Sequence, residues 1–224
     1  MTAPAERRIP LNRERVLEVA MAFVDEYGIE SLSMRKLGQA LGVEAMSLYN
    51  HVANKDDILD GIVDLVYAEI ELPAAGGDWE GEVRKFAVSA HDALIRHPWA
   101  PRGMMRGRPR PIRMQYMESL CCCLRLAGFS SDATYLAYHA IDSHILGFTL
   151  WQQGHSMVRE RIPDMAAKVL RELPLEEFPF MAEHVRQHLT DGSHHDVSTF
   201  DFTLGLILDG LKRMRGAPGH VPAR

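Results

Sequence analysis

The sequence predicts an all-α protein, with a three-helix helix-turn-helix head joined by a linking helix to a larger C-terminal helical domain. Apolar residues recur at the three- and four-residue spacing of a helix face along most of the 224 residues. Capping residues and glycines bound these stretches, and no stretch alternates as a half-buried strand does. Hydrophobic residues make up 46% of the chain, an ordinary fraction for a globular protein with a sizeable core.

The chain lacks a run of about 18 apolar residues, so we expect no membrane span. Its first ten residues, MTAPAERRIP, have no apolar centre of the kind that a signal peptide needs. These two observations predict a cytoplasmic protein.

Local capping signals bound the first helices. Asn12 is a suitable N-cap, Gly28 a suitable C-cap, and Ser33 a second N-cap. Gly42 is placed to turn the chain between two short helices, and Asn54 precedes a long apolar helix. The predicted helices are 12–27, 34–41, 45–52 and a fourth that starts after Asn54. The residues expected to face inward on the second helix are Leu37, Ala40 and Leu41.

Helical patterns continue beyond the segment 73–77, Pro-Ala-Ala-Gly-Gly, which interrupts the fourth helix. The further predicted helices are 79–96, 113–127, 131–153, 165–173, 178–189 and 200–214. The predicted loops are 97–111, 128, 161–163 and 191–198. The chain is thus predicted to form two domains, residues 1–56, which include a short basic N-terminal arm, and residues 57–224.

Charge neither supports nor excludes a nucleic-acid partner. The formal net charge is −5, but the seven Lys and Arg up to Lys55 balance the seven Asp and Glu of the same segment. Binding to phosphates needs a few well-placed bases on one surface, and not a basic protein as a whole.

The segment 33–55 has the layout of a helix-turn-helix, with a glycine turn and a second helix that is polar and aromatic on its outer side. In this segment and around it the chain closely resembles TetR-family transcriptional repressors. The matching residues are 27–37, Leu41-Gly42-Val43, Leu48-Tyr49, His51-Val52 and Asn54-Lys55. The similarity continues through Trp79, Arg108-Pro109, 128–130, Leu146-Gly147, Phe202 and Gly210-Leu211, which places the whole chain in the tetracycline-repressor-like branch.

The resemblance implies binding to double-stranded DNA. Ala45, Met46, Ser47 and Asn50 would face base edges. There Asn50 suits adenine, Ala45 or Met46 suits a thymine methyl, and Ser47 can donate or accept a hydrogen bond. Arg35 resembles the family's base-contacting arginine and suits guanine. The matches to phosphate-contacting positions are Tyr49, His51 and Lys55. The alternative for Tyr49 and His51 is packing between helices, whereas Leu48 and Val52 are core residues by spacing.

The resemblance also implies a small-molecule effector in the C-terminal domain. Met104 and Trp151 replace the residues that hold a drug-bound magnesium in this branch, so we expect no tetracycline–magnesium effector. The remaining lining is apolar and suits a hydrophobic or aromatic ligand. The candidate effector residues are Phe86, Met104, Met105, Met117, Leu120, His144 and Trp151. The alternative is that these are ordinary core side chains.

Two predicted helices are apolar on more sides than one subunit can cover, and this favours a homodimer that addresses two-fold related half-sites. Their apolar residues are Phe200, Phe202, Leu204, Leu206, Ile207, Leu208 and Leu211, and upstream Tyr135, Tyr138, Ile141, Leu146 and Phe148. Sequence does not separate a repressor from an activator, or a small-molecule signal from a protein partner. A ligand-binding protein without a DNA role is a further alternative.

No catalytic motif is apparent, and we expect no enzyme, no cofactor and no metal site. His184 and His188 have the i, i+4 spacing of a metal pair, and His194-His195-Asp196 lies in a polar stretch, but neither has further ligands nearby in sequence. The consecutive Cys121, Cys122 and Cys123 are read as small core residues, with a redox-sensing thiol as the alternative.

Overall fold

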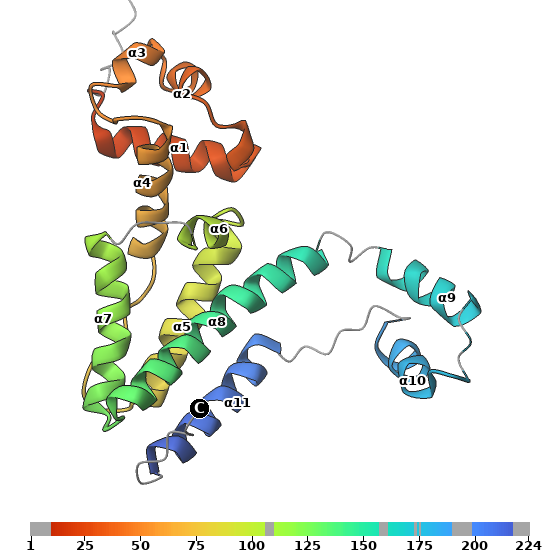
Figure 1. Ribbon diagram of the computed structural model, residues 1–224. Coiled ribbons are helices and arrows are strands. Elements are labelled where there is room, and N and C mark those ends of the chain that lie inside the picture. The colour runs from red at the N-terminus through yellow and green to blue at the C-terminus, as the bar shows by residue number, and fades with distance from the viewer. Residues whose placement is uncertain are drawn as a thin grey trace, which may run out of the picture. The chain divides into compact units, whose positions relative to one another are not determined.

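The computed structural model describes residues 10–105, 110–156, 161–172, 174, 176–189 and 199–216. Every regular element within these ranges is a helix, which confirms the predicted fold class (Figure 1). The chain forms two compact units, residues 1–128 and 129–224. The division predicted at residue 56 falls near the start of a helix of the first unit and stays a prediction. The predicted basic arm lies outside the described residues.

The first unit begins with α1, η1, α2 and α3, whose bounds are Arg13–Tyr27, Ile29–Ser31, Met34–Leu41 and Ala45–Leu48. The predicted caps are present. Asn12 Oδ1 accepts the Arg15 N–H at 2.8 Å, and Ser33 Oγ accepts the Lys36 N–H at 3.3 Å. Gly42 takes the left-handed conformation, with a φ of 68°, and so turns the chain from α2 into α3.

The helix predicted over 45–52 is too long, because α3 ends at Leu48. The next three residues form i to i−3 hydrogen bonds, from the N–H of Tyr49 to Met46 O, of Asn50 to Ser47 O and of His51 to Leu48 O, at 3.3, 3.4 and 2.9 Å. Such bonds tighten the last turn of a helix and satisfy its carbonyl groups. The side chains of the residues after Leu48 therefore project from a tight turn and not from a regular helix.

Helices α4, α5, α6 and α7 complete the first unit, with bounds Lys55–Ala68, Trp79–Arg96, Ala100–Met104 and Pro111–Leu126. Helix α6 corrects the loop predicted over 97–111. Proline and glycine, here Pro101 and Gly103, disfavour a helix in a sequence pattern. Proline is nevertheless tolerated in the first turn, where its missing N–H would have no partner within the helix. Helix α4 packs on α1, α6 and α7 and so links the first three helices to the rest of this unit (Figure 1).

Two core predictions for α2 need correction. Leu37 is fully buried, as expected, but Ala40 is exposed and Leu41 is only half-buried. A helix of eight residues presents one narrow face to α1, and Leu37 occupies its centre. Leu48 and Val52, which follow the turn, are buried as predicted.

The second unit contains α8, α9, α10 and α11, with bounds Ser131–Ser156, Ile162–Glu172, Pro179–His188 and Thr199–Gly216. Helix α8 packs on α11, and α9 packs on α10. The loop predicted over 161–163 is wrong, because α9 starts at Ile162 with Pro163 in its first turn. The loop predicted over 191–198, with His194, His195 and Asp196, lies outside the described residues. No described helix has the length and apolarity to span a bilayer.

Candidate nucleic-acid interface and effector site

The helix-turn-helix depends on a close approach between α2 and the start of α3. Gly38 O accepts the Val43 N–H at 2.9 Å. A Cβ added to Gly38 would lie 2.9 Å from Val43 O, closer than a Cβ approaches a backbone atom, and 3.2 Å from Ala45 N, which is also tight. Sequence reasoning missed Gly38, although a glycine inside a short helix that precedes a glycine turn is a signal of close packing.

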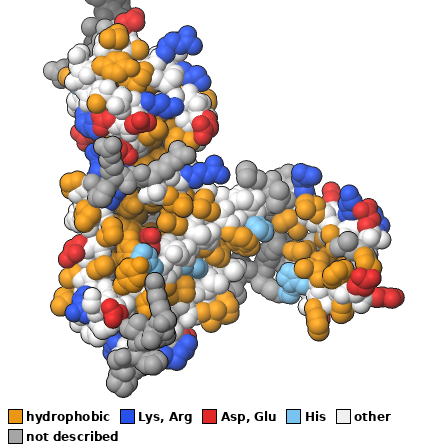
Figure 2. All heavy atoms as spheres, viewed as in Figure 1, with side chains coloured by type: hydrophobic (Ala, Val, Ile, Leu, Met, Phe, Trp, Pro, Cys, Tyr) orange, Lys and Arg blue, Asp and Glu red, His pale blue; other side chains and the backbone are white. Residues whose placement is uncertain are grey.

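The residues predicted to contact DNA lie on α2, on α3, on the turn after it and at the start of α4. Met46 is 75% exposed and Tyr49 is 47% exposed. Arg35 and Asn50 are also exposed, and Ala45, Ser47, His51 and Lys55 are half-buried. On the surface of the head, hydrophobic side chains lie among Lys and Arg side chains (Figure 2). These side chains thus come from one continuous segment of the head, and their contacts with DNA stay a prediction.

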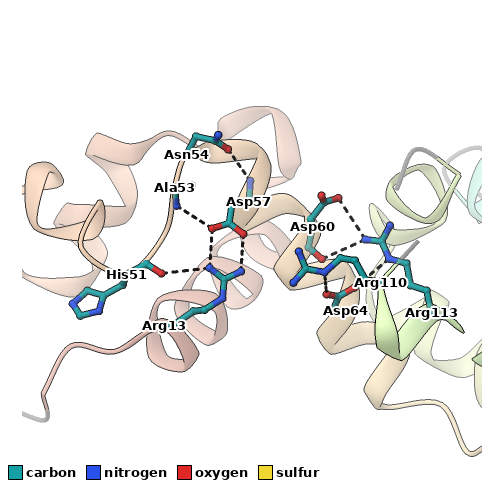
Figure 3. A network of polar contacts seen from close by, with 9 residues as sticks. All are labelled: Arg13, His51, Ala53, Asn54, Asp57, Asp60, Asp64, Arg110 and Arg113. Carbon is teal, nitrogen blue, oxygen red and sulfur yellow. Dashed lines mark hydrogen bonds and ion pairs between the residues drawn. The ribbon is translucent and has the colours of Figure 1, made fainter. Parts of the chain in front are cut away.

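A polar cluster joins the start of α1 to the start of α4 (Figure 3). Arg13 Nη1 and Nη2 donate to Asp57 Oδ2 and Oδ1 at 2.8 and 2.7 Å. Asp57 Oδ2 also accepts the Ala53 N–H at 2.9 Å. The Arg13 hydrogen bond holds the pKa of Asp57 at about 2 against a usual 3.8, and the Ala53 N–H contributes, although partial burial opposes the shift. The pKa of Arg13 is raised by the same pair.

Further along α4, two carboxylates meet two arginines at the start of α7 (Figure 3). Arg113 Nε lies 3.1 Å from Asp64 Oδ1, and Arg113 Nη2 lies 3.5 Å from Asp60 Oδ1. Arg110 pairs with the second carboxylate oxygen of Asp64. The Arg113 side chain is only 6% exposed, so it depends on these carboxylates and on the Tyr67 ring, whose centroid lies 5.8 Å from its Cζ.

The predicted effector residues divide between the two units. Phe86 on α5 and Leu120 on α7 are fully buried, in helices that pack on each other. The Phe86 ring lies 4.9 Å from that of Tyr116, which sequence reasoning did not single out. Met104 is half-buried, but Met105 and Met117 are 71% and 41% exposed. The structure therefore does not bring all five first-unit candidates into one interior.

In the second unit, His144 stacks on Phe200 at 4.7 Å between ring centroids, with 22° between the ring planes. Its Nε2 lies 3.3 Å from Phe200 O. Burial lowers the pKa of His144, and the contact with the Phe200 carbonyl opposes that shift. His144 thus links α8 to α11, whereas Trp151, on α8, is 52% exposed. Their role as effector contacts stays a prediction.

The candidate metal-binding histidines and the three consecutive cysteines lie on α10 and α7. The rings of His184 and His188 lie 5.1 Å apart, and within the described ranges no three His, Cys, Asp or Glu are grouped to hold a metal ion. Cys121, Cys122 and Cys123 are free thiols on α7, and only Cys123 is fully buried. Burial raises the pKa of Cys121 and Cys123, which lowers their thiolate fraction.

Comparison with known proteins assigns the chain to a family. Residues 16–62 match the sequence model described as "Bacterial regulatory proteins, tetR family", and residues 72–215 match "Tetracyclin repressor-like, C-terminal domain". The second match alone spans more than half of the chain. The chain belongs to the TetR family. It is accordingly a DNA-binding transcriptional regulator, as the resemblance of its segment 27–55 predicts.

Comparisons with individual TetR-family proteins support the same assignment. A transcriptional regulator of Saccharopolyspora erythraea is 33% identical over 140 residues, which make up 61% of this chain and 59% of that protein, less than two thirds of its length. The class D tetracycline repressor protein of Escherichia coli is 35% identical over 149 residues, 65% of this chain and 68% of the repressor. The crystal structure of Streptomyces coelicolor ActR with actinorhodin aligns over 93% of this chain and all of ActR, with a TM-score of 0.76 and 27% identity.

Proposed function

We propose that this TetR-family regulator is a homodimeric repressor, which a small hydrophobic or aromatic effector releases from paired half-sites on its operator. The observation that carries the proposal is that α11 is apolar on two sides. One side is buried and consists of Phe200, Leu204, Leu208 and Leu211. On the other side, Phe202 and Leu206 are 59% and 57% exposed and lie one helical turn apart.

Helix α8 adds to this exposed apolar area. Tyr135 is 64% exposed and Leu136 is 44% exposed, on a helix that packs beside α11. Exposed large apolar side chains on two helices that pack together are characteristic of a protein–protein interface. A second copy of α8 and α11 would complete a four-helix bundle across a two-fold axis.

A two-fold dimer presents two heads to DNA, with half-sites about one helical turn or more apart. We assign base contacts to Arg35, Ala45, Met46, Ser47 and Asn50, and phosphate contacts to Tyr49, His51 and Lys55. The exposure of Met46 and Tyr49 supports this assignment, because exposed apolar and aromatic side chains on a helix-turn-helix gain contacts when DNA covers them.

An aromatic or hydrophobic effector fits the chemistry of the candidate residues. Phe86 and Leu120 offer apolar surface, and Met104 adapts to varied ligand shapes. A methionine and an exposed tryptophan, Trp151, cannot replace the ligands of a drug-bound magnesium ion. The similar protein ActR binds actinorhodin in its crystal structure, which supports an organic effector. Effector binding would favour a conformation whose heads no longer match the half-sites.

Light scattering on purified protein tests the dimer. The wild type is expected at twice the monomer mass, and the double variant F202E/L206E at the monomer mass, because carboxylates replace the exposed side of α11. The matched control is F180E on α10, where Phe180 is 84% exposed, and it should leave the dimer intact. A wild type that stays monomeric at the concentrations that bind DNA contradicts the proposal.

Gel shift with a duplex enriched from a random library by the wild type tests the docking residues. Tyr49→Ala is expected to abolish the shift while light scattering still reports a dimer. Tyr27→Ala, at an exposed tyrosine of α1, is the control and should bind as the wild type does. Unchanged affinity of the Tyr49 variant would count against the assigned pose.

Thermal-shift screening with hydrophobic aromatic compounds tests the effector. Compounds that raise the melting temperature should also release the enriched duplex, and a reporter placed under that duplex separates repression from activation. A screen in which no compound raises the melting temperature would count against the proposed effector class. Binding of the enriched duplex in the gel shift would still support the DNA-binding role.

A further inference from the structure

The carboxylate of Asp57 lies close in sequence to residues that are expected to contact DNA. It lies in the first turn of α4, two residues after Lys55, which is expected to contact phosphate. A carboxylate near DNA repels the phosphates, but the first turn of a helix favours acidic residues, and Asp56 stands beside Asp57 there. The structure shows three N–H groups directed at it, two from Arg13 and one from Ala53 (Figure 3).

Arg13 reaches a second group of the same segment. Its Nη1 lies 3.3 Å from the carbonyl oxygen of His51, so one guanidinium connects α1 to both ends of the turn between α3 and α4. Asn54 Oδ1 accepts the Asp57 N–H at 2.9 Å and closes the segment on the other side. Residues 51–54 contain no regular helix, and these bonds hold their backbone in one conformation.

The planar fork of arginine suits this task. Two parallel N–H groups fix both oxygens of a carboxylate and therefore fix its orientation, which a single ammonium group cannot do. The pair also has no net charge, because the Asp57 anion neutralises the Arg13 cation. Arg13 thus contributes little as a free positive charge toward a phosphate.

We propose that Arg13 and Asp57 are positioning residues for DNA recognition. They fix the turn 51–54, and through it the direction of α3 and the places of His51 and Lys55, without contacting DNA themselves. The inference rests on the proposed docking residues. A recognition element that is loosely held loses specific contacts before it loses general attraction to DNA, so the pair should affect specificity more than non-specific binding.

Asp57→Asn and Asp56→Asn form a matched pair for the test, because both remove one carboxylate from the first turn of α4 and Asp56 is exposed outside the cluster. Affinity is measured by fluorescence anisotropy on the wild-type-enriched duplex and on a scrambled duplex of equal composition. D56N should bind the enriched duplex as well as the wild type, or about twofold more tightly. D57N should bind it about tenfold less tightly and keep its affinity for the scrambled duplex.

Arg13→Lys separates positioning from phosphate contact. Lysine keeps the charge and loses the fork, so a phosphate contact would survive the change and a positioning role would not. R13K is expected to lower affinity for the enriched duplex several-fold, with the same slope of log affinity against log salt as the wild type. Lys55→Ala should reduce that slope by about one.

Circular dichroism and light scattering on each variant confirm the fold and the dimer. Should D57N not fold, R13K, which keeps both charges, carries the test by itself. Affinity of D57N equal to that of D56N, or affinity of R13K equal to that of the wild type, overturns the inference. Failure of the proposed docking looks different, since Tyr49→Ala and Lys55→Ala would then bind as the wild type does.

Discussion

His97 Nδ1 lies 2.8 Å from Asp25 Oδ1, although the two residues are 72 positions apart in the chain. The other ring nitrogen, Nε2, lies 3.1 Å from Glu69 Oε1. Trp99 Nε1 donates to the same Asp25 oxygen at 2.6 Å, and Arg96 Nη2 pairs with Glu69 Oε2 at 2.6 Å. His97 therefore joins Asp25, near the end of α1, to Glu69, the residue after α4.

His97→Ala is expected to lower the free energy of unfolding by about 2–3 kcal/mol, because a buried ring with two charged partners is lost. Urea unfolding followed by circular dichroism measures the change. The control is His184→Ala at an exposed position of α10, where we expect a change within about 0.5 kcal/mol. Equal changes in the two variants would mean that the contacts of His97 with Asp25 and Glu69 do not contribute to the free energy of unfolding.

The Arg13–Asp57 pair predicts a pH dependence of stability. The folded-state pKa of Asp57 is lowered from 3.8 to about 2, so the contribution is complete above pH 4 and is lost as the pH falls toward 2. Asp57→Asn should be less stable than the wild type by about 1–2 kcal/mol at neutral pH, since the partly hydrated pair is screened by solvent. Urea unfolding at a series of pH values should show this gap closing on acidification. A gap independent of pH would be inconsistent with the pair.

Arg113 and Arg110 contact the same carboxylate, but they differ in burial. The Arg113 side chain is 6% exposed and that of Arg110 is 33% exposed. Arg113→Ala is expected to lower the free energy of unfolding by about 3 kcal/mol, because Asp64 and Asp60 lose the buried cation with which they pair. Arg110→Ala is expected to cost about 0.5–1 kcal/mol. Urea titration of the two variants ranks them, and the reverse order would contradict the larger contribution expected of the more buried Arg113.

Gly38→Ala tests the close approach within the helix-turn-helix. The added methyl would meet the Val43 carbonyl oxygen at 2.9 Å, so the backbone must move, at a cost of about 1–3 kcal/mol. Binding to the enriched duplex should weaken as well. The matched control is Gly154→Ala in α8, where nothing lies within 4 Å of the added Cβ and alanine favours the helix by up to about 1 kcal/mol. A Gly38 variant as stable as this control would show that the contact is easily relieved.

Much of the fold was predictable because its signals are local. The caps at Asn12 and Ser33 act on N–H groups three residues away, and the turn at Gly42 needs only a residue that adopts positive φ. The periodicity of α5 predicts its bounds, Trp79–Arg96, without reference to the rest of the chain. Family resemblance in the segment 27–55 adds the DNA-binding role for the same reason, since its residues are contiguous.

The tertiary structure decided what depends on distant residues. Arg13 and Asp57 are 44 positions apart, and Arg113 and Asp64 are 49 apart, so no pattern along the chain pairs them. The early end of α3 and the short helix α6 are set by backbone hydrogen bonds that compete with ordinary helix periodicity. Sequence by itself determined the fold class, most of the helices and the family, because capping and amphipathic spacing act over a few residues. Only the tertiary structure decided which charges are buried together, because burial and pairing arise when separate helices pack.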